Sequence, residues 1–283
     1  MQNWKAILTY DGTPFHGWQI QPNLPTIQGT LAHTLHHVTG ETVLPQGSGR
    51  TDTGVHALAQ VATFALEAPI PAPNLLRALN RALPRSIRIL SVDHVAPDFH
   101  ARHSALRKTY EYRIHPTAST RICSPMLAPW VWDLPAALDL SQLNRASSHI
   151  LGTHDFASFA ASDPDLTTRT GEPSAPSTLR TILDATWTRT DDLYTFRITG
   201  NGFLHHMVRN LVGTFVEVSL NRIHPDAIPA ILAARNRSAA GPTAPARGLF
   251  LVNVIYPDLE PRSALQSQIE SRLQLQHSET ANL

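Results

Sequence analysis

The order of the secondary-structure elements expected in the first hundred residues restricts the fold more strongly than any other feature of the sequence. Two segments, residues 26–38 and 74–83, carry apolar side chains at the spacing of amphipathic helices. Short runs of apolar and β-branched residues alternate with these helices and are expected to be strands, namely residues 4–10, 41–44, 60–64 and 87–95. The resulting β-α-β-β-α-β order predicts a ferredoxin-like, RRM-like unit.

The ends of both helices are marked in the sequence. Thr26 precedes the first helix and is its expected N-cap, because a threonine side chain accepts a hydrogen bond from the first turn. Gly40 is expected to end this helix. Pro84 closes the second helix, since proline lacks the backbone N–H that a helix interior requires.

A second half is expected after a hinge at residues 97–104. It begins with a strand at residues 107–114, in which Tyr110 and Tyr112 share one face. The elements expected after this strand are a helix at residues 140–151, hairpin strands at 182–187 and 194–199, a turn into a helix at 201–213, a helix from 228 and a closing strand at 248–257.

The chain is therefore predicted to be an α+β protein with two halves, residues 1–104 and 105–257, each with a mostly antiparallel sheet backed by helices. Residues 163–177 are rich in Pro, Thr and Asp, and we expect a mobile loop there. Residues 258–283 are rich in Ser and Gln, and we expect a weakly ordered helical tail.

Composition limits the location and the partners. The 283 residues contain no apolar run near the ~18 residues of a membrane span, and the N-terminus lacks the apolar segment of a signal peptide, so we expect a cytoplasmic protein. The single cysteine, Cys123, excludes an internal disulfide and a cysteine metal cluster. Although the net charge is only +1, basic residues gather between Arg77 and Arg113, which is compatible with a phosphate-contacting surface.

Chemistry is concentrated in the stretch G-S-G-R-T-D-T-G-V-H-A, residues 47–57. Its glycines permit tight turns, and Arg50 and Asp52 are close enough in sequence to pair. A cation within roughly 4–6 Å favours the ionised form of a carboxylate, which suits a nucleophile or a base. The stretch is equally compatible with a hairpin turn that contains a structural ion pair, whereas the lysine and Ser/Thr of a phosphate-binding P-loop are missing.

This stretch resembles the catalytic signature of the tRNA pseudouridine synthase A (TruA) family, G-x-G-R-T-D-x-G-V-H-A. Four further segments are similar to family patterns in the same order along the chain. They are Y-D-G-x-x-F-x-G-W-Q-x-Q at residues 10–21, R-K-x-Y-x-Y at 107–112, G-x-x-D-F-x-S-F at 152–159 and F-x-H-x-M-V-R-N at 203–210. The resemblance extends over nearly the whole chain up to Pro257.

The resemblance implies an isomerase that converts uridine to pseudouridine at positions 38, 39 and 40 of the tRNA anticodon stem-loop, without metal or other cofactor. It implies that Asp52 is the catalytic carboxylate, that Arg209 meets it, and that Tyr110 contacts the target base. Arg50 is expected to fill the space left by the flipped nucleotide or to contact a phosphate. The resemblance also implies a homodimer, two sheets joined edge to edge, and an active-site cleft between the halves.

A metal site is not expected, and two alternative functions remain open at this stage. His205 and His206 are adjacent, but neighbouring side chains on a helix diverge by about 100° and no carboxylate accompanies them in sequence, so we expect no metal site. An RRM-like module that binds RNA without catalysis would not need Asp52. A carboxylate-based nucleoside hydrolase would need a second acid near Asp52, and the sequence offers none at similar spacing.

Overall fold

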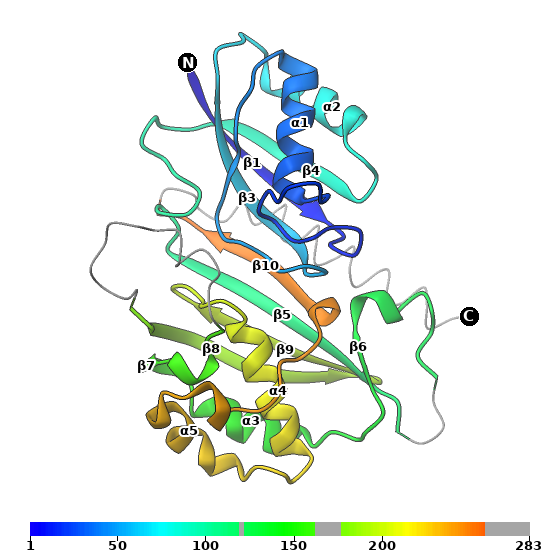
Figure 1. The fold of residues 1–283 in the computed structure, drawn as a ribbon, viewed down its shortest axis with the longest axis vertical. Helices are drawn as coiled ribbons and strands as arrows, with labels where there is room; N and C mark the ends of the chain where they lie inside the picture. Colours follow the sequence, from blue (N-terminus) through cyan, green and yellow to red (C-terminus); the bar gives the residue numbers. More distant parts are fainter. Residues whose placement is uncertain (119–121, 162–176, 258–283) are drawn as a thin grey trace.

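The strands of both halves form one mixed, ten-stranded sheet, shown in Figure 1 for a computed structural model of the chain. The structure describes residues 1–118, 122–161 and 177–257. The strands are β1 (Gln2–Tyr10), β2 (Gln46–Gly47), β3 (His56–Leu66), β4 (Ile87–His94), β5 (Arg107–Pro116), β6 (Trp132–Leu134), β7 (Gly152–Asp155), β8 (Leu179–Thr190), β9 (Leu193–Gly200) and β10 (Leu249–Ile255). The α-helices are α1 (Ile27–Thr39), α2 (Ala72–Ala82), α3 (Leu140–Ser148), α4 (Met207–Ser219) and α5 (Ile228–Ala234).

The first half has the predicted β-α-β-β-α-β order. Its sheet runs β4-β1-β3 with antiparallel pairing, and β2 pairs with β3. The side chain of Thr26 accepts a hydrogen bond from the backbone N–H of Gly29, and Gly40 ends α1 in the left-handed conformation, so both predicted helix boundaries are confirmed. Helices α1 and α2 pack together and cover this part of the sheet (Figure 1).

The predicted strand at residues 41–44 is wrong. The second strand of this half lies at Gln46–Gly47 instead. Glu41 uses its side chain where a strand would use its backbone: its carboxylate accepts hydrogen bonds from the backbone N–H groups of Glu67 and Ala68, at 2.9 and 2.8 Å. Residues 41–44 are therefore tied to the end of β3 without joining the sheet.

The second half contributes the order β5-β9-β8-β7, all antiparallel, with β6 parallel to the far end of β5. The predicted hairpin is confirmed, and its turn contains Asp191 with a positive φ of 53°. Tyr110, Tyr112 and Ile114 are all buried on one face of β5, as predicted. Helices α3, α4 and α5 lie at this end of the molecule (Figure 1).

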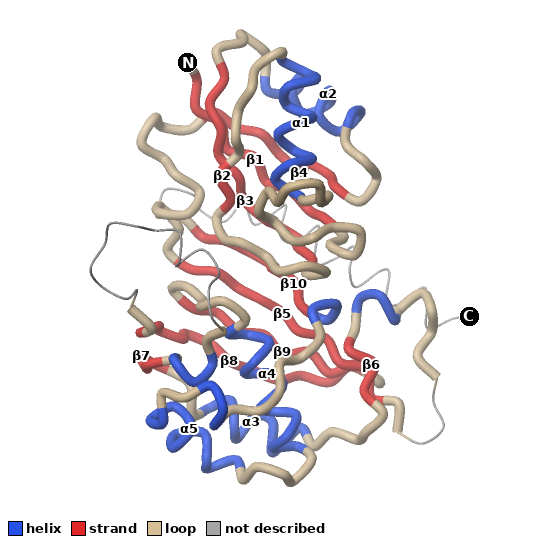
Figure 2. Tube along the Cα trace, in the orientation of Figure 1, coloured by secondary structure: helices blue, strands red, loops and turns tan. Residues whose placement is uncertain are grey.

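Strand β10 joins the two halves. It pairs in parallel with the start of β3, where Phe250 lies opposite His56, and antiparallel along β5. In Figure 2 the strands continue across this junction from β3 through β10 to β5. The predicted edge-to-edge joining of the sheets is thus confirmed, with the last strand of the described chain between them.

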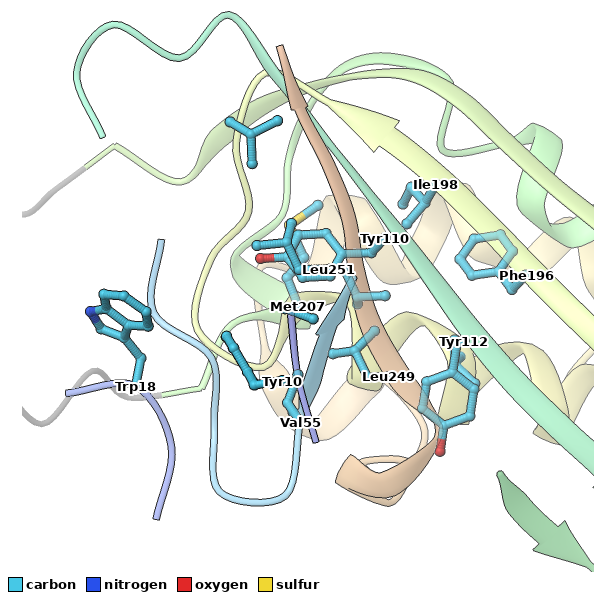
Figure 3. Close-up of a cluster of buried hydrophobic side chains, with 14 of the residues drawn as sticks. Tyr10, Trp18, Val55, Tyr110, Tyr112, Phe196, Ile198, Met207, Leu249 and Leu251 are labelled. Atoms are coloured by element: carbon cyan, nitrogen blue, oxygen red, sulfur yellow. The ribbon is translucent and has the colours of Figure 1, made fainter. Parts of the chain in front are cut away.

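A continuous hydrophobic core runs under the junction. Figure 3 shows Tyr110 beside Leu251 of β10, with Tyr10 and Val55 of the first half on the adjoining side. All four side chains are at most 7% exposed. The core therefore fixes the relative position of the segments that precede and follow the G-S-G-R-T-D loop.

Several predictions are not tested by this structure. The division at residues 104 and 105 stays a prediction, because one sheet and one core extend over both halves. The expected mobile loop, apart from Ser177, and the expected tail at residues 258–283 lie outside the described residues. Within the residues that the structure does describe, none of the helices has the length and apolar character to span a bilayer.

Candidate active site

The loop between β2 and β3 is held from below by one buried glutamine. Ser48 is fully buried, and its Oγ donates a hydrogen bond to Gln60 Oε1 at 2.6 Å. The Gln60 side-chain amide in turn donates to the carbonyl oxygen of Gly49 at 2.9 Å. Because Gln60 is itself in β3, these bonds lock the start of the loop to the central sheet.

The middle of the loop is held by the segment after β1. Thr51 Oγ1 and the Tyr10 hydroxyl lie 2.8 Å apart in a buried hydrogen bond, and the Trp18 backbone N–H donates to the Thr51 carbonyl at 2.9 Å. Gly17 has a φ of +83°, and a Cβ there would lie only 2.6 Å from the Thr51 carbonyl oxygen. The segment after β1 thus supports the loop, and the close approach to Thr51 gives a physical reason for the glycine at position 17.

A lysine from the second half holds the same loop from the other side. Lys108 of β5 donates a short hydrogen bond from Nζ to the Ser48 carbonyl oxygen. Burial, and to a smaller degree the cations Arg102 and Arg180, lower the pKa of Lys108 to about 8. This contact was not predicted from the sequence, although Lys108 belongs to the R-K-x-Y-x-Y motif.

Asp52 and Arg209 meet across the two halves. The Arg209 Nη1 atom lies 2.8 Å from Asp52 Oδ2, and the two side chains are only 15% and 20% exposed. Arg209 Nε also donates to the carbonyl oxygen of Ala244 at 2.8 Å, which fixes the guanidinium plane. The predicted meeting of Asp52 and Arg209 is observed, and it occurs in a partly desolvated setting where an ion pair is stronger than at the surface.

His205 and His206 also face Asp52, which the sequence analysis did not predict. Their Nε2 atoms lie 3.6 and 3.3 Å from the two carboxylate oxygens, and the rings are 4.0 Å apart between centroids. The helical geometry assumed for them was wrong: α4 begins only at Met207, and His206 has a left-handed φ of 59°. A positive φ is unusual for histidine and turns the backbone so that neighbouring side chains converge.

Burial and the neighbouring charges determine the protonation of His206. Burial lowers its pKa, and the neighbouring His205, Arg209 and Arg237 lower it further, against the attraction of Asp52. The neutral imidazole is therefore favoured near neutral pH. Asp52, His205 and His206 have donor atoms close enough together to hold a metal ion, but the guanidinium of Arg209 already occupies one carboxylate oxygen.

Tyr110 is 7% exposed and lies within the electrostatic range of Asp52. Its ring makes an edge-to-face contact with Phe203, with centroids 5.1 Å apart. Burial raises its pKa far above the ordinary value, and the hydroxyls and charges of Tyr10 and Asp52 act in the same direction. The phenol is therefore neutral. Phe203 sets the angle of the Tyr110 ring, and the sequence did not indicate this role.

Arg50 lies in the loop two residues before Asp52, with its side chain exposed. Its predicted pairing with Asp52 stays a prediction.

Arg102 and Arg180 lie near Lys108. Arg180 flanks Gly202, where an added Cβ would lie 3.6 Å from Arg180 Nε. Arg102, Lys108 and Arg180 act on one another electrostatically, and their mutual repulsion contributes to the lowered pKa values of Lys108 and Arg180.

Comparison with known proteins assigns the chain to one family. The family model described as tRNA pseudouridine synthase matches residues 6–104 and 146–257. The chain belongs to the tRNA pseudouridine synthase family. Both matched ranges contain cleft residues, Asp52 in the first and His205, His206 and Arg209 in the second.

Individual members of this family are similar over almost their full length. The tRNA pseudouridine synthase A of Solibacter usitatus is 46% identical over 257 residues, which cover 90% of this chain and 100% of that protein. That of Acetivibrio thermocellus is 43% identical over 256 residues, with 90% and 100% coverage, and that of Moorella thermoacetica is 44% identical over 254 residues, with 89% and 98% coverage. The resemblance identified from the sequence motifs is confirmed.

Proposed function

We propose that this member of the family isomerises uridine to pseudouridine in tRNA, with Asp52 as the catalytic carboxylate. The observation that carries the assignment of Asp52 is its pairing at 2.8 Å with Arg209, which comes from the other half of the chain. Asp226 also lies beside an arginine and two histidines, Arg145, His149 and His224, but its side chain is 43% exposed, whereas that of Asp52 is 20% exposed.

The reaction requires a carboxylate next to the sugar of the target nucleotide. The N1–C1′ glycosidic bond breaks, the base turns in place, a C5–C1′ bond forms, the C5 proton leaves and N1 takes up a proton. Asp52 either attacks the electron-poor sugar or removes a sugar proton, and both uses require the ionised carboxylate that Arg209 stabilises. The low exposure of Asp52 and Arg209 supports a site that limits access of water to the intermediate.

We assign the contact with the target base to Tyr110. Its ring is fixed by Phe203, and its hydroxyl oxygen lies near the loop, 4.0 Å from where a Cβ on Gly49 would be. A fixed aromatic ring beside a carboxylate suits a base that has been turned out of the stack. Arg50 is exposed in the same loop, in a position to fill the space left by that nucleotide or to contact a phosphate.

We propose that the tRNA anticodon stem-loop, with positions 38, 39 and 40, is the substrate and that the enzyme acts in the cytoplasm, where tRNA is found. The cations Arg102, Lys108 and Arg180 gather on one side of the cleft and repel one another. A phosphate backbone relieves such repulsion. Contacts to backbone and shape suit an enzyme that acts at several neighbouring positions.

We further propose that the enzyme works as a homodimer. The connection between β5 and β6 presents Ile122, Met126 and Trp130, which are 92%, 75% and 39% exposed. Apolar side chains exposed together on one segment support a protein contact. Sedimentation analysis of the wild type and of Ile122→Asp tests this: the wild type should sediment as a dimer, and a monomeric wild type contradicts the proposal.

Asp52→Asn tests the proposed catalytic role. The amide has the same shape but is neither a nucleophile nor a base, so pseudouridine formation should be abolished while fold and tRNA affinity are kept. Pseudouridine mapping on tRNA lacking the modification is the readout, and Asp226→Asn, which changes a surface carboxylate paired with Arg145, is the matched control. Activity of Asp52→Asn within tenfold of wild type would refute the role of Asp52.

The same experiment separates the enzyme from a non-catalytic RRM-like protein. Such a protein binds tRNA but leaves its uridines unchanged, so the wild type and Asp52→Asn would give identical maps. Full conversion by the wild type and none by the variant supports the isomerase.

A further inference from the structure

A second group of potential metal ligands lies away from the cleft, where β6 pairs with the end of β5. His115, Cys123 and Asp133 each present one ligand atom, and these atoms lie within 4.8 Å of one another. The three residues come from β5, from the connection after it and from β6. The proposed reaction uses none of them.

The sheet brings two of the three together by its register. Strands β5 and β6 are parallel, and His115 lies opposite Asp133. The Asp133 carboxylate is oriented from the other side by Thr117, whose Oγ1 donates to Asp133 Oδ1 at 2.8 Å. A hydrogen bond of this kind to a carboxylate is typical of the groups that support metal ligands.

The histidine has unused bonding capacity. The Nδ1 atom of His115 is buried and has no hydrogen-bond partner among the described residues. A buried polar atom without a partner is destabilising and calls for an explanation. Cys123 is 8% exposed, and its sulfur has only a 3.7 Å contact to the carbonyl oxygen of Ser124. Two soft or borderline ligand atoms therefore lie close to a carboxylate, with Cys123 buried and His115 and Asp133 half-buried.

A catalytic cysteine does not explain this group, because Cys123 is only 8% exposed and a reactive thiol needs access to its substrate. A bound cation, in contrast, stabilises a thiolate next to a carboxylate.

We propose that His115, Cys123 and Asp133 bind a zinc ion. Thiolate, imidazole and carboxylate are the three ligand types of protein zinc sites, and three protein ligands leave a fourth position for water. The cleft group of Asp52, His205 and His206 is the weaker competitor, because the Arg209 guanidinium lies 2.8 Å from its carboxylate and repels a cation. The ion ties the connection between β5 and β6 to the sheet.

Cobalt titration of the whole protein under reducing conditions tests the proposal. Co²⁺ bound to a thiolate gives a near-ultraviolet charge-transfer band, and this chain has a single cysteine, so the band can arise only from Cys123. We expect the band to saturate at one Co²⁺ per chain and to be bleached by one equivalent of Zn²⁺. We also expect Zn²⁺ to raise the Tm, since a ligand that binds only the folded state stabilises it.

Variants distinguish this site from the cleft. Cys123→Ser should lose the band, and Asp133→Asn should weaken cobalt binding at least tenfold, whereas Asp52→Asn should keep both the band and its affinity. Circular dichroism shows whether each variant is folded, and a folded Asp133→Asn decides the question if Cys123→Ser does not fold. Absence of the charge-transfer band in the wild type, or unchanged cobalt affinity in folded Asp133→Asn, overturns the proposal.

Discussion

The bridge between Asp52 and Arg209 allows a quantitative prediction. Arg209 makes two directed bonds, from Nη1 to Asp52 and from Nε to the Ala244 carbonyl, each 2.8 Å long. Lysine keeps the charge, but its single ammonium group does not reproduce the planar fork that makes both bonds. Arg209→Lys therefore tests whether the direction of the contact matters in addition to its charge.

The expected size of the effect follows from the burial of the pair. A hydrogen bond to a charged group contributes about 1.5–3 kcal/mol, and the full range applies here because both side chains are one-fifth exposed or less. If this interaction is lost in the transition state, the rate falls about 10- to 150-fold. Arg209→Met also removes the charge, and breaking a buried pair costs about 3–5 kcal/mol, which corresponds to a loss of about 150- to 5,000-fold.

Single-turnover rates on unmodified tRNA measure this effect, together with tRNA binding and thermal unfolding. The matched control is Arg222→Lys, which changes an exposed arginine paired with Glu217 at 3.0 Å and should leave the rate unchanged. Equal rates for Arg209→Lys and the wild type would show that charge alone suffices. A folded Arg209→Met with the wild-type rate would contradict the role of the pair altogether.

Three further predictions concern Tyr110, the basic residues Arg102 and Arg180, and Lys108. If the Tyr110 hydroxyl moves the C5 proton, as we expect, Tyr110→Phe lowers the single-turnover rate about 10²–10⁴-fold with binding unchanged; a fully active Phe variant beside an inactive Tyr110→Leu would show that the ring only stacks. The affinity for tRNA should fall linearly with salt on logarithmic axes, and Arg102→Gln or Arg180→Gln should each reduce the slope by about one unit; an affinity independent of salt contradicts a phosphate-binding role. Lys108 has a pKa of about 8, below that of an unfolded lysine, so the folded state binds fewer protons above that pH and stability gains as pH rises from about 8 towards 10.5; denaturant unfolding should show this gain in wild type relative to Lys108→Met, and a pH-independent difference would refute it.

Local signals in the sequence predicted most elements of the fold. Thr26 and Gly40 mark the ends of α1 because capping depends on side-chain chemistry and on left-handed backbone, both of which act over a few residues. The wrong prediction of a strand at residues 41–44 has a long-range cause. Glu41 bonds to the backbone at Glu67 and Ala68, and a contact over that separation leaves no pattern in the segment itself.

The candidate site was predicted only in part, because contacts between residues far apart in the chain leave no local signal. The meeting of Asp52 and Arg209 came from the family resemblance, since the two residues are 157 positions apart. The approach of His205 and His206 to Asp52 depends on the left-handed φ of His206, which no residue-type preference predicts. The position of His206 directly before an amphipathic helix was the available signal, because the residue before a helix does not have helical geometry.

The place of β10 in the sheet has a consequence for how the protein is made. His56 and Arg247, which hydrogen-bond beside this junction, are 191 residues apart in a chain of 283, so a large part of the chain is translated between β3 and its partner. During that interval the nascent first half exposes an unpaired strand edge, the kind of edge that templates aggregation. When Arg209 has been synthesised, Ala244, which fixes its guanidinium, has still to follow. A ribosome that stops before Ala244 would therefore release two open sheets and an incomplete site, and chaperones that bind strand edges would be needed until β10 is complete.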